Sequence, residues 1–225
     1  MSTANENQPV PPLVPSERPG KVGGKRDANR RRRTAQLCRG ALGLYLEHGI
    51  GSVTVDQIVA RAGVAKGSFY RYFADQTQLV ETLLRPLGEG FVAATDRCEA
   101  RLDGAAPAEL PGIYLQLASD LATAVGGQLD LLRLYLQESR SPPSGARRPV
   151  RELADEITRR GVHLSTVARD AGLLRESDPR IGALTVIGAV ERMAFGLLAG
   201  EDLGRLEQIP AALIDMILDG VRGAR

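Results

Sequence analysis

The residues best suited to bind a polyanion are concentrated in one short segment. They are cationic and hydroxyl-bearing side chains that would share the outer side of a helix, with a glycine among them: Lys66, Gly67, Ser68, Tyr70, Arg71 and Tyr72. Lysine and arginine can donate hydrogen bonds to guanine O6 and N7 or to phosphate, whereas serine and tyrosine hydroxyls bond phosphate oxygens. Phe69 and Phe73 are spaced to point inward together. The segment therefore predicts a helix that reads the major groove of DNA.

A second short helix is predicted directly before this one. Thr54, followed by Gln57 three residues later, has the form of a capping box, which begins a helix. Gly63 then supplies a tight turn. Together these signals predict a helix-turn-helix over about 54–73. Glycine costs about 1 kcal/mol inside a helix, so we expect Gly67 to allow the backbone to approach DNA closely.

The charges of the chain are divided unevenly along it, although the net charge is only +2. Residues 1–86 hold 13 basic and 7 acidic residues, a balance of +6, whereas residues 87–225 hold 16 and 20, a balance of −4. The Pro- and Gly-rich segment 1–29 is predicted to be a disordered basic tail. It leads into the run Arg30–Arg33, from which we expect Arg33 to contact DNA. The alternative is a solvated charge run that only assists solubility.

The segment 54–84 reads TVDQIVARAGVAKGSFYRYFADQTQLVETLL. It resembles the DNA-binding motif of the TetR family of transcriptional regulators, and the resemblance extends over residues 34–84. It implies an all-α homodimer of nine helices. The first three helices would bind DNA, and the remainder would bind a small effector and the partner subunit.

The resemblance also implies roles for single residues. Thr54 is similar to the residue whose cap and hydroxyl face a phosphate, and Lys66 to a lysine that contacts DNA. Tyr70 and Tyr72 resemble a pair of donors to backbone phosphate. The positions that vary within the family and often touch bases are those of Ser68 and Arg71.

Two residues depart from the family pattern. Ala65 stands where a serine commonly caps the recognition helix, which we expect to cost up to about 1 kcal/mol of capping. Gln76 stands where a lysine that contacts phosphate is usual, so one charge is missing from the footprint. The arginine run is a candidate to compensate for that charge.

The fold class predicted from the whole chain is all-α, with a three-helix DNA-binding domain over 30–90 and a larger effector-binding and dimerisation domain over 91–225. Apolar residues recur at helical spacing, and no segment shows the alternation of a strand. A proline at Pro86 is expected to kink or break the fourth helix. The predicted helices are 30–47, 55–62, 64–73, one opened by the Asp75 cap, 110–125, 129–139, 150–171, one opened by Asp178 and Pro179, and 210–221.

Pro86 also lies between the two predicted domains, so it is a candidate hinge. In that interpretation, effector binding would change the separation of the two recognition helices of a dimer. The alternative is a static kink.

The segment 181–200 is apolar on nearly every side, which predicts burial all round. A pair of C-terminal helices that packs against its copy would form a four-helix bundle. The alternative is that both helices belong to the core of a monomer. The residues expected at the dimer interface are Ile187, Ala194, Leu198, Leu213 and Ile217.

An effector site is expected between the helices of the second domain. Its candidate residues are large or polar groups that would converge there, although each is also explained as ordinary core packing. They are Phe91, Tyr114, Leu117, Leu121, Leu132, Tyr135, His163, Arg192 and Phe195.

These observations favour a dimeric DNA-binding regulator, a repressor released from a palindromic operator when a small, largely apolar molecule binds. The alternative is a DNA-binding regulator or architectural protein without an effector. We expect no enzymatic activity, metal or cofactor, because two histidines and two isolated cysteines form no catalytic or metal-binding pattern. The longest uncharged apolar run, 181–190, is about half of the roughly 20 residues that span a membrane. We therefore expect no membrane span. Residues 1–29 hold no apolar stretch of the kind that a secretory signal requires, so we expect a cytoplasmic protein.

Overall fold

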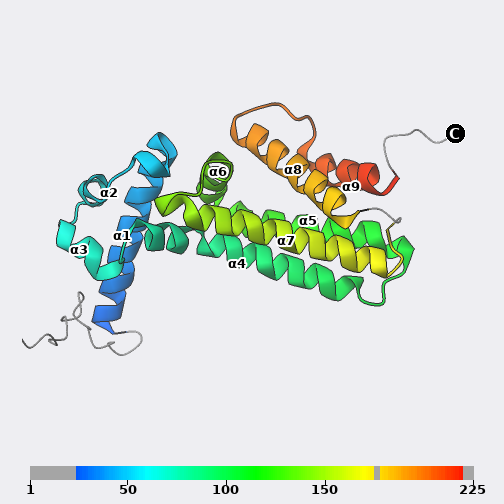
Figure 1. Cartoon of the computed structure of the whole chain (residues 1–225), viewed down its shortest axis with the longest axis horizontal. Coiled ribbons are helices and arrows are strands. Elements are labelled where there is room, and N and C mark those ends of the chain that lie inside the picture. The colour runs from blue at the N-terminus through cyan, green and yellow to red at the C-terminus, as the bar shows by residue number, and fades with distance from the viewer. Residues whose placement is uncertain (1–23, 175–177, 220–225) are drawn as a thin grey trace, which may run out of the picture.

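A computed structural model of the chain describes residues 24–174 and 178–219, and the predicted all-α class is confirmed over these residues. They form nine α-helices and no strand (Figure 1). The helices are α1 (Lys25–His48), α2 (Val55–Ala62), α3 (Lys66–Tyr72), α4 (Gln76–Leu102), α5 (Leu110–Gly126), α6 (Leu129–Glu138), α7 (Arg148–Asp170), α8 (Pro179–Leu198) and α9 (Ile209–Asp219).

The first helix is longer than predicted. It begins at Lys25 rather than Arg30, so the prediction of a disordered tail is wrong for residues 25–29, and the remaining tail residues 1–23 lie outside the described part of the chain. Two local interactions explain the extension. Asp27 lies in the first turn, where a negative charge favours the helix dipole, and its Oδ2 accepts a hydrogen bond from Arg31 Nη2 at 2.8 Å.

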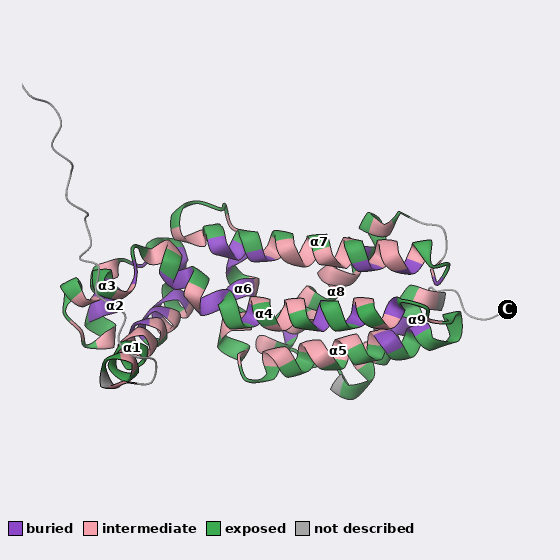
Figure 2. Ribbon diagram, turned by 90° about the horizontal axis from the view of Figure 1, so that it is seen from below, coloured by how far each residue is buried: buried purple, intermediate pink, exposed green. Residues whose placement is uncertain are grey.

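The N-terminal part of the molecule, which we call the head, consists of α1, α2, α3 and the start of α4. Its core is formed by apolar side chains that meet from all four helices, among them Leu37, Leu44, Ile58, Phe69 and Leu79. The head lies at one end of an elongated body made of the remaining helices (Figure 1). This arrangement leaves the outer sides of α2 and α3 open to solvent (Figure 2).

Helix α4 connects the head to the body without interruption. The predicted break at Pro86 does not occur, since α4 runs unbroken from Gln76 to Leu102 with Pro86 inside it. Pro86 is exposed, whereas Leu83, Leu84 and Leu87 around it are buried in the core. Packing on both sides of the proline holds the helix together despite the missing backbone hydrogen bond. The domain boundary expected after residue 90 falls within this single helix.

The body is a bundle in which α4, α5 and α7 lie side by side, with α8 packed on α7 and α9 packed on α5 (Figure 1). Its own core gathers around Cys98, Leu102, Leu110, Leu164 and Ala168. The short helix α6 lies between the body and the head and contacts α1, α4 and α8. Its buried residues are visible next to α1 in Figure 2.

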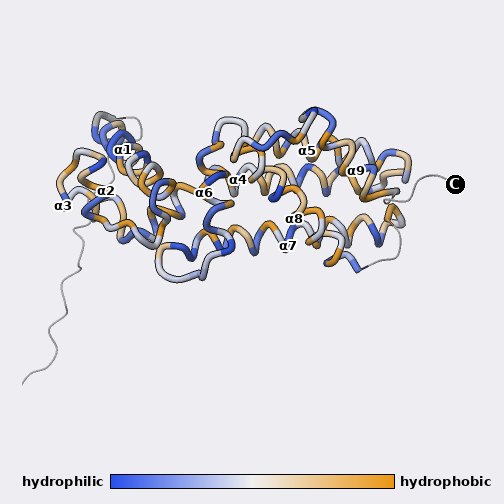
Figure 3. The backbone as a smooth tube through the Cα atoms, turned by 90° about the horizontal axis from the view of Figure 1, so that it is seen from above, coloured by the Kyte–Doolittle hydropathy of each residue, from blue (hydrophilic) through white to orange (hydrophobic). Residues whose placement is uncertain are grey.

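Helix α8 is apolar yet poorly covered. Most of its residues are not buried within the chain. Hydrophobic stretches run along both α8 and α9 (Figure 3). Its most apolar window of 18 residues has a mean hydropathy of 1.6. The expectation that no helix is long and apolar enough to span a membrane is therefore wrong, because α8 continues past the uncharged run. By itself one such helix is weak evidence for a membrane, since helices at protein interfaces have the same composition.

Candidate nucleic-acid interface

Helix α3 is held in the head by two phenylalanines. Phe69 is fully buried and its ring lies 5.6 Å from that of Phe73, which confirms that both point inward. Gly63 at the end of α2 adopts a left-handed conformation with φ of 65°, which suits glycine because it has no Cβ. The predicted turn between the two helices is thus confirmed. Ala65 provides no side-chain cap to α3, so the helix relies on packing for its position.

The outer side of α3 carries most of the residues predicted to bind DNA. Lys66, Gly67, Tyr70 and Arg71 are exposed, while Ser68 and Tyr72 are half-buried. Gly67 has open space where a Cβ would project. Neither this space nor any neighbour explains a glycine at the position, so its close approach to DNA stays a prediction.

Thr54 begins α2 with the predicted capping box, which is confirmed. Its Oγ1 accepts a hydrogen bond from the Gln57 backbone N–H at 3.3 Å, and the Gln57 Oε1 accepts one from the Thr54 backbone N–H at 2.8 Å. Asp75 caps α4 in the same way, since its Oδ1 accepts from the Gln78 N–H at 2.9 Å. Both caps fix the helix starts that flank the turn and α3.

Lys66 is paired with an acidic residue of α2. Its Nζ lies 2.8 Å from Asp56 Oδ1, and both side chains are exposed. The hydrogen bond to Asp56 raises the pKa of Lys66, so the ammonium is fully charged at neutral pH. Solvent screens a pair this exposed, so Asp56 holds the ammonium only weakly. A phosphate oxygen can therefore replace Asp56 at little cost.

The other basic residues of the head differ in how much of their charge is already paired. Arg61 donates two hydrogen bonds to Glu47 of α1 at 3.1 and 2.8 Å, which lower the pKa of Glu47. Arg33 is half-buried and donates to Gln36 at 3.1 Å. Arg71 is exposed and forms no hydrogen bond or ion pair with a residue that the structure describes. Arg71 is thus the cation of α3 that is most available to a base.

Two positions contribute to the head in ways that the sequence did not reveal. Gln76, where the family pattern has lysine, donates from Nε2 to the Val53 carbonyl at 2.9 Å and fastens the start of α4 beside α2. A Cβ on Gly40 would lie 3.3 Å from the Cβ of Ala62, so this glycine allows α1 and α2 to pack closely. The sequence alone does not show why a glycine stands within a helix, because the close approach depends on which helix packs beside it.

Residues 37–83 match the family model of bacterial regulatory proteins, tetR family. Transcriptional regulator AcuR of Cereibacter sphaeroides is 34% identical over 113 residues, which are 49% of this chain and 50% of AcuR. HTH-type transcriptional regulator TcmR of Streptomyces glaucescens is 36% identical over 73 residues, 32% of each protein. Residues 37–83 thus form a DNA-binding segment of the TetR type. The matched part of the chain spans half the length of AcuR and about a third of the length of TcmR.

The TetR fold extends over the body as well. The fatty acid degradation regulator FadR from Bacillus halodurans superposes with a TM-score of 0.64 at 18% identity, covering 85% of this chain and 97% of FadR. FadR from Bacillus subtilis, solved in complex with stearoyl-CoA, gives a TM-score of 0.63 at 18% identity and covers 84% and 99%. At this identity the likeness establishes the shared architecture.

The residues expected to line an effector site are spread over several helices and over two hydrophobic cores. Tyr114 and Leu117 of α5 pack on the body core, and Leu132 and Tyr135 of α6 pack on the head core. Phe91 of α4 and Leu121 of α5 are half-buried. Neither residue lines the cavity between α4 and α7 or the cavity between α6, α7 and α8.

Three of the expected effector residues point to solvent. His163 is exposed and lies 2.9 Å from Glu99 Oε1. Arg192 is exposed and donates to Glu201 of the following loop. Phe195 is 47% exposed. In the single chain these three residues are exposed because neighbouring helices cover only part of α7 and α8, and their role in an effector site stays a prediction.

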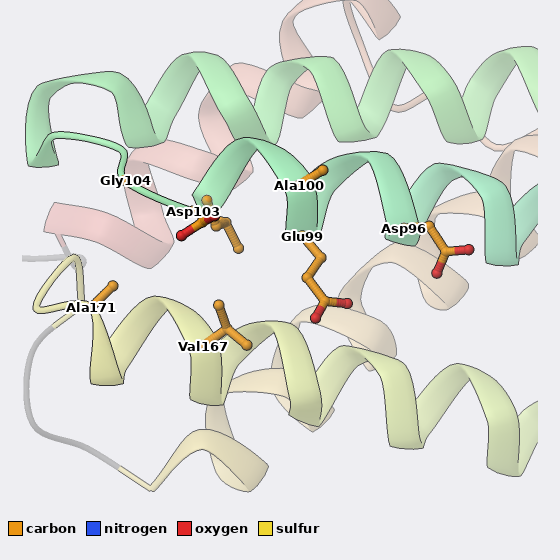
Figure 4. A pocket seen from close by; sticks show the side chains of 8 residues that line it. Asp96, Glu99, Ala100, Asp103, Gly104, Val167 and Ala171 are labelled. Atoms are coloured by element: carbon orange, nitrogen blue, oxygen red, sulfur yellow. The ribbon is translucent and has the colours of Figure 1, made fainter.

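Two open cavities in the body are formed by described residues. The larger, about 550 Å³, lies between the ends of α4 and α7 and has an acidic rim formed by Asp96, Glu99 and Asp103 (Figure 4). None of the nine expected residues lines it. The smaller, about 240 Å³, lies between α6, α7 and α8, and of the nine only Tyr135 lines it. There Tyr135 donates to Glu191 Oε1 at 2.7 Å.

The residues expected at the dimer interface differ in how far the chain itself covers them. Ile187 faces the chain's own helix α7, since its Cδ1 is 2.9 Å from the position of a Cβ on Gly161. This residue therefore belongs to internal packing. Ala194, Leu198 and Leu213 are half-buried, whereas Ile217 is exposed. Further large apolar side chains are exposed on the same two helices: Ile181, Leu184, Val190, Phe195, Leu197 and Met216.

Proposed function

We propose that the protein is a homodimeric transcriptional regulator that reads a palindromic DNA operator with α3 of each subunit. The observation that carries this proposal is the division of α3 into a buried side with Phe69 and an exposed side with Lys66, Tyr70 and Arg71. A helix of this kind enters the major groove while the rest of the head contacts the backbone. Thr54, Ser68, Gly67, Tyr72 and Arg33 complete the proposed footprint.

The exposed apolar side chains of α8 and α9 support a dimer. Large apolar side chains in this number are rarely left to solvent by a monomer. A two-fold axis through the α8–α9 pair would bury them in a four-helix bundle, and the two heads would then read half-sites related by the same axis. A regulator that binds DNA in this way would act in the cytoplasm.

We further propose that a small, largely apolar molecule releases the protein from its operator. Two relatives of the same fold support this class, since they were solved with stearoyl-CoA (FadR from Bacillus subtilis) and lauroyl-CoA (FadR from Thermus thermophilus). Within the described residues the smaller cavity has an apolar wall, formed by Ala154, Leu184 and Ile187, and a polar end at Tyr135.

The modest volume of that cavity favours a second candidate, a DNA-binding protein without an effector. Titrating acyl-CoA esters and short carboxylic acids into the operator complex distinguishes the two. Release by one chemical class supports the ligand-responsive repressor, whereas an unchanged complex throughout supports the second candidate.

A regulatory role without catalysis agrees with the two thiols. Burial raises the pKa of Cys38 and of Cys98 to about 11. A thiolate is the nucleophilic form of cysteine. Neither residue therefore supplies a nucleophile at neutral pH.

The direct test of the proposed interface compares Arg71→Ala with Lys66→Ala. Loss of a base contact by Arg71→Ala should cost about 1–3 kcal/mol on the operator and relax base preference. Loss of a phosphate contact by Lys66→Ala should weaken binding to all sequences and reduce the salt slope by about 1 per contact. Fluorescence anisotropy on operator and random duplexes at several salt concentrations measures both effects.

Arg151→Ala is the control for this comparison, because Arg151 is an exposed, paired cation of α7. Its affinity for either duplex should stay close to wild type. An equal loss on operator and random DNA for Arg71→Ala would remove its assignment as a base reader.

Neutralising the partner of Lys66 should have the opposite effect on DNA affinity. Asp56→Asn removes a negative charge 2.8 Å from the ammonium, which raises the net charge of the footprint by one. We expect binding to a random duplex to strengthen several-fold at about 50 mM salt and less at about 200 mM, because salt screens exposed charges.

Asp155→Asn is the matched control, since Asp155 is equally exposed and also paired, with Arg151 of α7. It makes the same change in net charge away from the helix-turn-helix. If both variants strengthened binding equally, the effect would come from net charge, and Lys66 would have no special place in the interface.

A further inference from the structure

A buried carboxylate joins the body to the head at the last residue of α6. Glu138 is only 6% exposed, and both of its oxygens are bonded. Oε1 accepts a hydrogen bond from the Ile50 backbone N–H at 2.9 Å, and Oε2 accepts one from Arg147 Nε at 2.6 Å. Ile50 lies in the loop between α1 and α2, so this contact crosses from the body to the head.

The loop is shaped to receive this pair. Gly49 has φ of 77°, a conformation that favours glycine, and a Cβ there would lie 3.0 Å from Glu138 Oε1. A Cβ on Gly51 would lie 2.7 Å from Arg147 Nη1. A side chain at Gly49 would crowd the carboxylate, and one at Gly51 would displace the Arg147 guanidinium. Two glycines therefore let the backbone lie directly on the Glu138–Arg147 pair.

A buried ion pair is a poor way to gain stability alone. Removing both charges from water costs about as much as their attraction returns, and apolar residues of similar size are often as stabilising. A fully bonded carboxylate instead fixes the positions of its hydrogen-bond donors, because its two oxygens accept at preferred angles. Glu138 thus defines where the Ile50 amide sits, and with it the start of α2.

The same short helix is attached at its other side to α8. Tyr135 donates to Glu191 Oε1 at 2.7 Å, and Arg133 Nη2 donates to the Leu198 carbonyl at 3.1 Å. Tyr135 and Glu191 also line the smaller cavity, as does Ser139, the residue after Glu138. A single helix of ten residues therefore connects α8 and this cavity to the loop that begins the helix-turn-helix.

We propose that Glu138 is a positioning residue for DNA recognition: with Arg147 it holds the Ile50 amide and so fixes α2 and α3 relative to α6 and the α8–α9 pair. This inference rests on the proposed function and adds the contact that sets the placement of the head. The spacing of the two recognition helices in a dimer then depends on the Glu138 carboxylate. Displacement of α6 would remove the acceptor of the Ile50 amide and loosen the start of α2 relative to α6.

The first test compares Glu138→Ala and Glu138→Gln on the full-length protein. Both lose the charge that pairs with Arg147, but the amide oxygen of glutamine can still accept from Ile50. Hydrogen exchange of the 49–53 backbone, measured without DNA, should accelerate at least tenfold in Glu138→Ala and much less in Glu138→Gln. Equal protection in wild type and Glu138→Ala would overturn the inference, whatever the DNA results are.

The second test measures binding to the best duplex selected from a random pool and to a random duplex of equal length. Glu138→Ala should lose at least tenfold on the selected duplex and less than about twofold on the random one, because Lys66 and Arg71 are unchanged. Glu138→Gln should recover part of the loss. Arg147→Ala should also lose selected binding, and the double variant should lose little more than the worse single variant.

Glu156→Ala serves as the control, since Glu156 accepts from Arg160 Nε at the same 2.6 Å but lies within α7, away from the head. It should bind both duplexes as wild type does. Operator binding by Glu138→Ala within twofold of wild type would overturn the positioning role. If Glu138→Ala does not fold, Glu138→Gln and Arg147→Lys are compared with wild type by hydrogen exchange of residues 49–53 and by binding to the two duplexes. Wild-type behaviour of both variants in both measurements would overturn the positioning role. Failure of wild type to select any sequence would instead refute the proposed function, with the exchange experiment still testing the contact.

Discussion

Phe195→Glu on α8 should convert the protein from a dimer to a monomer and lower its affinity for the operator at least 100-fold. The Phe195 ring is 47% exposed in the single chain, among the other apolar side chains of α8 and α9. A charge placed at the centre of an apolar interface is costly to bury. Two linked heads bind a palindrome far more tightly than one, by factors of about 10² to 10⁴. Sedimentation velocity and anisotropy on the operator measure the two effects.

Leu129→Glu is the matched control for this prediction. Leu129 is 52% exposed, similar to Phe195, but lies at the start of α6. The control should remain dimeric and bind the operator normally. Phe195→Glu should keep its helical content, because the residue is not part of either core. A variant that stays dimeric would contradict the assignment of α8 to the interface.

Phe69→Ala should unfold the head and abolish specific DNA binding. Phe69 is completely buried and packs on Phe73, so its removal leaves a cavity within the head core. Truncation of a buried phenylalanine costs about 3–5 kcal/mol. This is a large part of the stability of a typical domain. Urea denaturation followed by circular dichroism, together with binding to the operator, reports both consequences.

The neighbouring Tyr70→Ala separates stability from recognition. Tyr70 is 49% exposed and meets Phe69 only by an edge contact, with ring centroids 5.3 Å apart. We expect it to change unfolding free energy by less than about 1 kcal/mol while weakening DNA binding. If Tyr70→Ala destabilised the protein as much as Phe69→Ala, α3 would not have the inner and outer sides on which the proposed interface depends.

The helix-turn-helix was predictable because its signals are local. The Thr54 capping box, the Gly63 turn and the spacing of Phe69 and Phe73 each act over three or four residues, and the structure contains all of them. The first residues of α1 were missed because the Pro- and Gly-rich composition before them hid the position of Asp27, which lies in the first turn and pairs with Arg31.

Features that depend on distant contacts were not predictable in the same way. The continuity of α4 through Pro86 follows from buried leucines on both sides of it, whose partners come from other helices. The faces of Ile187 and Phe195 follow from where α7 covers α8, and helical periodicity alone does not show this. Likewise, Glu138 reads as an ordinary exposed glutamate until Ile50, 88 positions away, is placed beside it.

The most direct test of the central claim is selection of bound duplexes from a random DNA pool by the full-length protein. A two-fold dimer with α3 in the major groove should enrich a palindrome, with half-sites spaced by about one helical turn or a multiple of it. Arg71→Ala should shift the preferred bases within each half-site. A pool that shows no enriched sequence, or only single unpaired half-sites, would contradict the account.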